Sequence, residues 1–215
     1  MYQPAHHQFE VADPPALLAE LAAVVPATLV TLGPDGLRAS VLPMLFDPGD
    51  GPDGTLRGHV ARPNPQWHDI APDIEVLAIF NGPDGYVSPA WYEEKRRTGK
   101  VVPTWNYVTV LAHGSITVHR EPEWLHAHVR RLTDRHEMAR TDPWSIDDTP
   151  EGYVEIQVKA IVGLELRISR LEAKRKLTQN RSAADFESTV AGLDAGSPRE
   201  VALADEMRRE AGKES

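Results

Sequence analysis

The sequence contains no cysteine. This absence excludes disulfides, iron–sulfur clusters, thiolate nucleophiles and cysteine-based zinc sites. Any metal or haem would need histidine, aspartate, glutamate or tyrosine as its ligand. Nine histidines are present, but they form neither an HExxH helix nor a tight ligand cluster. We therefore expect neither a zinc hydrolase nor a bound metal ion.

The sequence is also short of positive charge, with 23 lysines and arginines against 32 aspartates and glutamates and a formal net charge of −9. Phosphate contacts to nucleic acid need clustered cations, and no helix-turn-helix pattern is recognisable. A GxSxG elbow and a Walker A loop are missing too, and the GxGxxG spacing at 49–54 is not a dinucleotide-binding fingerprint, because a predicted strand and not a helix follows it. We therefore do not expect direct DNA binding, and the main nucleophilic and nucleotide-binding classes have no support.

No apolar run approaches the ~18 residues that a membrane-spanning helix needs. The first four residues lack the basic-then-apolar pattern of a signal peptide. We expect a cytoplasmic protein that does not engage a membrane. Its 215 residues, 41% of them hydrophobic and 26% charged, suffice for one sizeable core with appendages.

Six runs rich in β-forming residues predict a sheet. They cover residues 28–32, 38–46, 55–60, 75–81, 104–119 and 160–168. The tetrad Gly-Pro-Asp-Gly at 33–36 predicts a hairpin turn between the first two runs. Gly114 predicts a bulge or a sharp bend within the long fifth run.

Helical patterns surround these runs and do not alternate with them as βαβ units would. They cover residues 14–25, 64–70, 90–97 and 123–140, and capping signals at Ser182 and Ser197 predict two more helices. The predicted class is α+β, mainly β. We expect residues 1–181 to form the main domain with its peripheral helices, and residues 182–215 a C-terminal helical extension with a frayed end.

The densest group of chemically useful residues is the segment 57–67, in which a strand runs through a proline-punctuated turn into a helix start. The start of a helix presents unpaired backbone N–H groups, and Arg62 adds a bidentate phosphate donor. Asn64 is a good N-cap for the helix that begins near Pro65. The segment suits the phosphate of a cofactor, with Arg62 as the anchor. The alternative is a surface turn with one solvated arginine.

A second group is aromatic, since five of the ten tryptophans and tyrosines fall in residues 86–92 and 102–107. Aromatic rings beside serine and asparagine suit a flat, partly polar ligand, but they equally suit a dimer interface or a barrel core. A third group is basic, because residues 167–181 carry six cations and one acid, Glu172. We expect most of these cations to lie on a solvated face, and we single out the run 176–181 as a candidate ligand contact.

Several of these motifs occur together in one known family. The runs RGHVARPNPQW (57–67), YVSPAWY (86–92), VPTWNY (102–107), LTDRHE (132–137), IVGLELRISRLEAKRKL (161–177) and TQNR (178–181) resemble the PaiB family of FMN-binding negative transcriptional regulators. The resemblance extends from residue 1 to about 193. It implies an FMN-binding split β-barrel of Greek-key topology, similar to the pyridoxamine-phosphate oxidases, that forms a homodimer with cofactor sites at the subunit interface.

The resemblance also implies a cofactor site, a small-molecule ligand or substrate, and an FMN-dependent oxidoreductase or a metabolic or transcriptional regulator. It does not identify catalytic residues. One strand would lie along the isoalloxazine, the end of the third strand and the turn after it would hold the ribityl phosphate, and the aromatic and basic groups would close the site from the same or the partner subunit. In that order, the residues are Arg38, Ala39, Ser40, Val41 and Leu42; His59, Val60, Ala61, Arg62, Asn64 and Gln66; and Tyr86, Ser88, Trp91, Tyr92, Trp105, Asn106, Lys176 and Arg181.

One departure from the family pattern leaves a second cofactor open. Many relatives read Ser-His-Leu-Pro where this chain has Ser-Val-Leu-Pro at 40–43. Relatives with a similar barrel, the piperazate synthases, use haem and form an N–N bond on an N-hydroxylated amino acid. His59 would be the natural axial ligand of haem b in an enzyme of that type, because neutral imidazole is a common ligand of haem iron.

Overall fold

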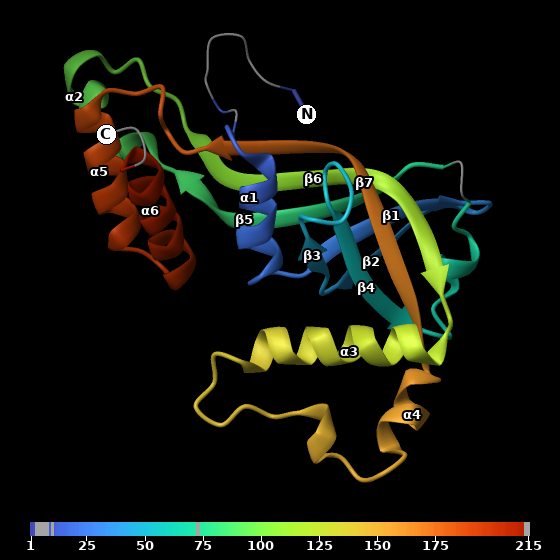
Figure 1. Ribbon diagram of the computed structural model, residues 1–215. Coiled ribbons are helices and arrows are strands. Elements are labelled where there is room, and N and C mark those ends of the chain that lie inside the picture. Colours follow the sequence, from blue (N-terminus) through green and yellow to red (C-terminus); the bar gives the residue numbers. More distant parts are fainter. Residues whose placement is uncertain (3–8, 10, 72–73, 213–215) are drawn as a thin grey trace. The chain divides into compact units, whose positions relative to one another are not determined.

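The structure is a computed structural model that describes residues 1–2, 9, 11–71 and 74–212. Its strands form one sheet in the order β2-β1-β5-β6-β7-β4-β3, so that β2 and β3 are the edges (Figure 1). Strand β1 pairs antiparallel with β2 and β5, and β4 pairs antiparallel with β3 and β7. The strands are β1 (Ala27–Gly33), β2 (Gly36–Leu42), β3 (Leu45–Asp47), β4 (Thr55–Ala61), β5 (Val76–Val87), β6 (Thr104–His119) and β7 (Ile161–Lys176).

Helices are peripheral to this sheet, which confirms the predicted α+β class. The α-helices of the described chain are α1 (Pro14–Ala22), α2 (Glu93–Thr98), α3 (Pro122–Glu137), α4 (Tyr153–Val158), α5 (Ala183–Asp194) and α6 (Pro198–Ala211). Short 3-10 turns cover Pro65–His68, Pro89–Trp91 and Ile146–Asp148. Ser182 caps α5 and Ser197 forms a capping box on α6, as predicted. Helix α4 was not predicted. Of the end expected to fray, residues 213–215 lie outside the described chain.

The chain forms two compact units. The first comprises Met1–Pro14, Asn81–Val110 and Glu172–Ser215, and the second comprises Pro15–Phe80 and Leu111–Leu171. Strands β5, β6 and β7 therefore contribute residues to both units. The boundary predicted at residue 181 stays a prediction.

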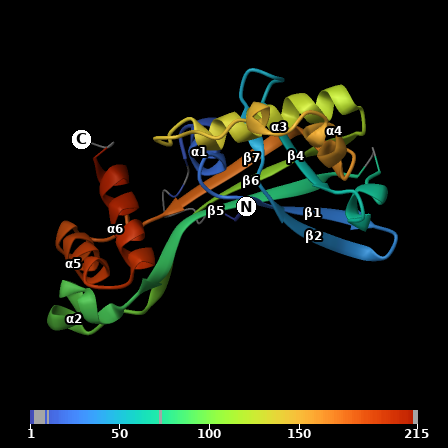
Figure 2. The same ribbon diagram turned by 90° about the horizontal axis from the view of Figure 1, so that it is seen from below.

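The second unit contains the predicted hairpin, in which β1 and β2 lie side by side with Ala27 opposite Leu42 (Figure 2). Gly36 closes the turn with a φ of 104°, a conformation that favours glycine. The sheet then curls until the end of β2 approaches β4. A Cβ on Gly58 would lie only 3.0 Å from the carbonyl oxygen of Pro43. The strands β2 and β4 are not paired in the described part of the chain, so this close approach gives the partly open barrel that the resemblance implied.

Helix α3 covers β4 and the first part of β7 within the same unit (Figure 1). The indole of Trp124 occupies the space that a side chain at Gly163 would fill. Leu125 and His128 are the buried residues of the helix. Glycine in β7 therefore permits α3 to lie directly against the sheet, and α3 brings a histidine into the core.

The first unit is built around α5 and α6, whose buried residues include Leu193, Leu203 and Met207. Arg175 of β7 is only 6% exposed, and its Nε donates to Glu206 Oε1 at 3.1 Å. Lys174 is 5% exposed. The expectation of a solvated basic face is therefore wrong for these two cations, because β7 continues beyond its predicted end and carries them into the interior.

Candidate functional site

A hydrogen-bond network in the second unit joins β2 to the turn that follows β4. Asn64 caps the 3-10 turn by accepting from the backbone N–H of Gln66 at 2.9 Å, as its sequence position predicts. The other end of the Asn64 side chain, Nδ2, donates to Ser40 Oγ at 3.0 Å. Two residues that the resemblance assigned to the cofactor are therefore in direct contact. We call Ser40, Asn64 and Gln66 the Ser40 network.

Gln66 is the buried member of this network, with 1% of its surface exposed. Its Nε2 donates to Leu29 O and to Thr31 Oγ1, both at 3.1 Å. Its Oε1 is buried and accepts no hydrogen bond from a described residue. Buried acceptors normally have a partner, so this oxygen is suited to a donor supplied by a ligand or a water molecule.

Strand β2 separates the other residues assigned to it. Arg38 and Ser40 alternate with Ala39 and Val41, so the two pairs project from opposite faces, and Ala39 and Val41 are exposed. Leu42 is buried in the core. Arg38 Nε lies 2.6 Å from Asp69 Oδ2. Only the face that carries Ser40 turns toward the network.

Arg62 holds the junction of β4 and β7. Its backbone N–H donates to Ala160 O at 2.8 Å, Nε donates to Lys159 O at 2.6 Å, and Nη2 donates to Ile161 O at 3.0 Å. The guanidinium therefore fastens two segments that are about a hundred residues apart in the sequence. The anchoring of a phosphate by Arg62 stays a prediction, and two of the five N–H donors of its guanidinium already serve the main chain.

His59 of β4 meets His128 of α3 in a histidine pair, with His59 Nδ1 and His128 Nε2 3.1 Å apart. Trp124 stacks on His128, and the ring centroids are 5.2 Å apart. Burial lowers the pKa of both imidazoles and brings that of His128 to about 3, where His59, Arg131 and Arg57 contribute as well. Both rings are therefore neutral at physiological pH and share one proton between the facing nitrogens.

The histidine pair adjoins an apolar pocket of about 270 Å³. His59 lines it, together with side chains of α3, α4 and the loop between them, among them Trp144, Ile146, Tyr153 and Val158. Val60 is buried and Ala61 exposed on the neighbouring positions of β4. The sequence analysis assigned His59 to the site but not His128. A histidine in a strand and a histidine in a distant helix come into contact only in the folded chain.

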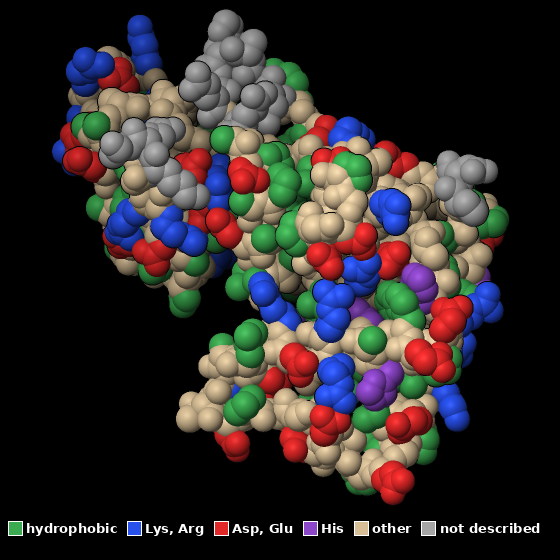
Figure 3. Space-filling model, in the orientation of Figure 1, with side chains coloured by type: hydrophobic (Ala, Val, Ile, Leu, Met, Phe, Trp, Pro, Cys, Tyr) green, Lys and Arg blue, Asp and Glu red, His purple; other side chains and the backbone are tan. Residues whose placement is uncertain are grey.

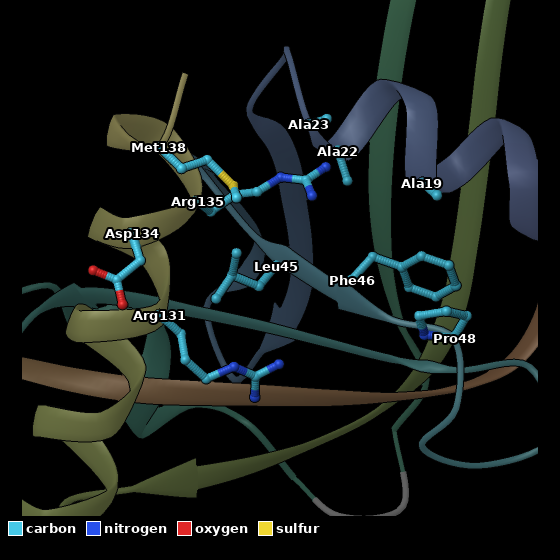
Figure 4. A pocket seen from close by; sticks show the side chains of 10 residues that line it. All are labelled: Ala19, Ala22, Ala23, Leu45, Phe46, Pro48, Arg131, Asp134, Arg135 and Met138. Atoms are coloured by element: carbon cyan, nitrogen blue, oxygen red, sulfur yellow. The ribbon is translucent and has the colours of Figure 1, made fainter. Parts of the chain in front are cut away.

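Another pocket of the second unit, of about 460 Å³, lies between α1, β3 and α3 (Figure 4). Arg131 and Arg135 of α3 extend into it on either side of Leu45, and Phe46 and Pro48 lie beyond Leu45. None of the residues assigned from the sequence lines this pocket. It combines apolar side chains with two arginines and the carboxylate of Asp134, and none of its lining residues belongs to the Ser40 network.

The first unit holds a pocket of about 370 Å³ that we call the cationic pocket. Lys174, Lys176 and Arg181 line it, of which the sequence singled out the last two. Arg181 lies over the ring of Tyr92, with Cζ 4.6 Å from the centroid. The other lining residues are Tyr2, Phe9, Val102, Pro103, Thr104, Asn106, Tyr107, Thr178 and Asn180. The sequence signal that was missed is the alternation of Lys174 and Lys176, which places both on one side of a strand.

The remaining aromatic residues of the first unit have different roles. The rings of Tyr86 and Trp105 are 6.4 Å apart and about half exposed. Trp91 lies where a side chain at Gly192 would be, so it packs on α5. Ser88 caps the turn at Pro89–Trp91 by accepting from Ala90 N. Contact of these residues with the same cofactor as the Ser40 network stays a prediction.

Replacing Asn64 with alanine should lower the free energy of unfolding by about 1–2 kcal/mol, because both the cap and the bond to Ser40 are lost. Asn64→Asp keeps the capping oxygen and loses only the amide donor, so it should lose less. Urea unfolding would measure both, with the exposed Asn180→Ala as the control. Equal stability of Asn64→Ala and the parent would show that the network does not hold β2.

The described residues contain no group of three or more histidine, aspartate or glutamate side chains placed to bind a metal ion. No helix in the described part of the chain is long and apolar enough to cross a bilayer.

The partly open barrel, with polar side chains at the seam between β2 and β4, defines a split-barrel protein of the cofactor-binding class. More specifically, the chain belongs to the family described as "Putative FMN-binding domain", whose model matches residues 1–170. The chain is 36% identical over 200 residues to an uncharacterized protein of Aspergillus fumigatus, with 74% of this chain and 76% of the relative covered. It is 31% identical over 166 residues to protease synthase and sporulation protein PAI 2 of Bacillus subtilis, with 77% of each covered.

Solved structures agree on the fold. The FAD and heme binding protein from Mycobacterium smegmatis superposes with a TM-score of 0.56 at 17% sequence identity, covering 86% of this chain and 80% of that one. At this identity the likeness concerns the fold.

Proposed function

We propose that this protein binds FMN and acts as a flavin-dependent oxidoreductase on a small molecule, as a cytoplasmic homodimer. The observation that carries the proposal is the Ser40 network, which lies within residues 1–170, the part that matches the FMN-binding family. It combines a hydroxyl on an edge strand with a buried amide oxygen that no described residue satisfies. Both are features of a site built to orient a polar ring system.

The residues fit this cofactor in chemical kind. The flavin ring system carries donors and acceptors along one edge, so Ser40 Oγ and Gln66 Oε1 are suitable partners. When bound, a flavin supplies hydride and electron transfer. The protein's own contribution is to fix these side chains. Gln66 is held by β1, and Ser40 is held by Asn64, so the site is ordered before a ligand arrives.

An FMN titration would test the proposal. We expect purified protein to acquire the flavin absorbance bands on incubation with FMN, with one flavin per protomer. Ser40→Ala should weaken FMN and riboflavin alike, by roughly five-fold for one hydrogen bond. Ser115→Ala, an exposed serine on β6, is the matched control. Protein that stays colourless after incubation, or a Ser40 variant with unchanged affinity, would count against this assignment.

A second candidate is a haem enzyme with His59 as axial ligand, which the histidine pair favours. If His59 Nδ1–H donates to His128, then His59 Nε2 is unprotonated and available to a metal, as in many metal-ligating histidines. The adjoining pocket of about 270 Å³ is below the usual ~300–1,000 Å³ of pockets that enclose a ligand, so haem ranks second to flavin. Reconstitution with haem would test this candidate. A Soret band that is lost in His59→Ala and kept in His68→Ala would rank haem above flavin.

We do not propose direct DNA binding. Over α3 and α4 the surface mixes lysine and arginine with aspartate and glutamate (Figure 3), and two cations of the basic group at 167–181, Lys174 and Arg175, are buried. A phosphate backbone needs a continuous exposed basic stripe. Any regulatory role would then be indirect, through the small molecule on which the protein acts.

A further inference from the structure

The cationic pocket gathers three positive charges in a protein whose formal net charge is −9. Lys174 and Lys176 approach the same ring, with their Nζ atoms 5.8 and 5.9 Å from the centroid of Tyr107. Arg181 completes the group from its position over Tyr92. None of the described residues that line the pocket is acidic.

These cations differ from their neighbour Arg175, which projects from the other side of β7. Arg175 forms ion pairs with Glu206 and Glu210. Lys174 and Lys176 instead donate to neutral oxygens, the carbonyl of Tyr2 at 3.0 Å and the hydroxyl of Thr104 at 2.5 Å. The strand therefore neutralises the charge on one of its sides and leaves two lysines on the other without an acidic partner among the described residues.

Buried cations without a counter-charge are costly. Burial and the proximity of Lys174 lower the pKa of Lys176, which expresses this cost. A bound anion would offset this desolvation cost, because it balances the positive charge and accepts hydrogen bonds from the lysine and arginine N–H groups.

Polar groups around the cations are also held in place for a ligand. Asn106 is fully buried, and its Nδ2 donates to Thr178 Oγ1 at 2.8 Å. The oxygen of the same amide, Oδ1, is buried and accepts no hydrogen bond from the described chain. Thr178 has a φ of 71°, a left-handed conformation that costs energy for a threonine and recurs at ligand sites.

We propose that the cationic pocket binds the phosphate group of a small phosphate monoester. Three cations balance the two charges of a phosphate monoester better than the single charge of a carboxylate ligand. Asn106 Oδ1 suits a hydroxyl of the ester or of its protonated form. The volume of about 370 Å³ accommodates a small organic molecule, and the three rings of Phe9, Tyr92 and Tyr107 offer apolar contact. Both lysines and Arg181 lie beyond residue 170, outside the part that matches the FMN-binding family.

The phosphate has two possible sources, FMN itself or a separate phosphorylated substrate. The proposal is independent of flavin binding, because phenyl phosphate can be titrated in calorimetry without flavin in a phosphate-free buffer. We expect saturable binding of phenyl phosphate and none of phenol. Lys176→Met and Arg181→Met should each raise the Kd about ten-fold or more, as expected for loss of a charge-assisted contact.

Lys95→Met is the control, since it removes one charge from an exposed lysine of the same unit. Arg181 is half-buried at the pocket, so its variant tests the site even if Lys176→Met does not fold. A parallel titration with FMN and riboflavin identifies the source of the phosphate. If both variants bind FMN more weakly and riboflavin as before, the pocket holds the cofactor phosphate. If their affinity for FMN is unchanged, the pocket holds the phosphate of a separate substrate. Absence of saturable binding of phenyl phosphate, or an equal effect in Lys95→Met, overturns the proposal.

Discussion

Between pH 6.5 and pH 4 the protein should lose about 3 kcal/mol of its free energy of unfolding through His128 alone. The pKa of this imidazole falls from its ordinary 6.5 to about 3 because it is buried beside His59. In this interval the imidazole is protonated in the unfolded chain and neutral in the folded chain, so the free energy of unfolding decreases as the pH is lowered. Each pKa unit corresponds to ~1.4 kcal/mol, and about 2.5 units are crossed. The loss begins near pH 6.5 and is complete near pH 3.

Urea unfolding at pH 7 and pH 4 would measure the effect. Carboxylates also titrate in this range, so the parent is compared with His128→Phe, which keeps an aromatic ring against Trp124 and removes the titrating group. The variant should lose about 3 kcal/mol less than the parent on acidification. His136→Gln, at an exposed histidine of the same helix, should behave like the parent. Parallel pH profiles for the parent and His128→Phe would show that the buried imidazole is not the cause.

Gly114→Ala should be among the most damaging single substitutions in the second unit, with a loss of about 3 kcal/mol or more. A Cβ at this position would collide with the carbonyl oxygen of Arg167 in β7. The contact is with backbone, which cannot rotate away as a side chain can, so either β6 or β7 must move. The sequence predicted a bulge or bend at this glycine, and the structure shows the close approach of two strands.

Thermal or urea unfolding of Gly114→Ala would test this. Gly49→Ala is the matched control, because a Cβ there would meet only Asp47 Oδ1 at 3.8 Å, an ordinary contact. The same methyl group should therefore be tolerated in the loop and not in the strand. Similar stabilities for the two variants would mean that β6 and β7 can separate without cost.

Much of the fold was predictable because local chemistry decides it. The long strand at 104–119 was predicted with its observed bounds, and the hairpin turn, the Asn64 cap and the caps of α5 and α6 follow from single residues with defined backbone preferences. The resemblance identified the family from motifs in the correct order. Strand β5 was predicted to end at Asn81 but continues to Val87, through Pro83, which normally marks a turn.

The site was less predictable, because it depends on contacts distant in the sequence. The basic residues at the end of β7 have the sequence pattern of a solvated face. Arg175 is nevertheless buried, because Glu206, thirty-one residues later, forms an ion pair with it. His59 and His128 are 69 residues apart. Arg62 could be recognised as a donor, but the carbonyl groups that it contacts could not, since main-chain acceptors carry no sequence signal.

The family match ends at residue 170, and that limit falls inside β7, which continues to Lys176. A border of sequence similarity is therefore not a border of folding here. A chain cut after residue 170 would stop in the middle of a strand that has β6 and β4 as its neighbours, and would leave the adjoining strand with an unpaired edge. Fragments of this protein made for study should extend at least through α6.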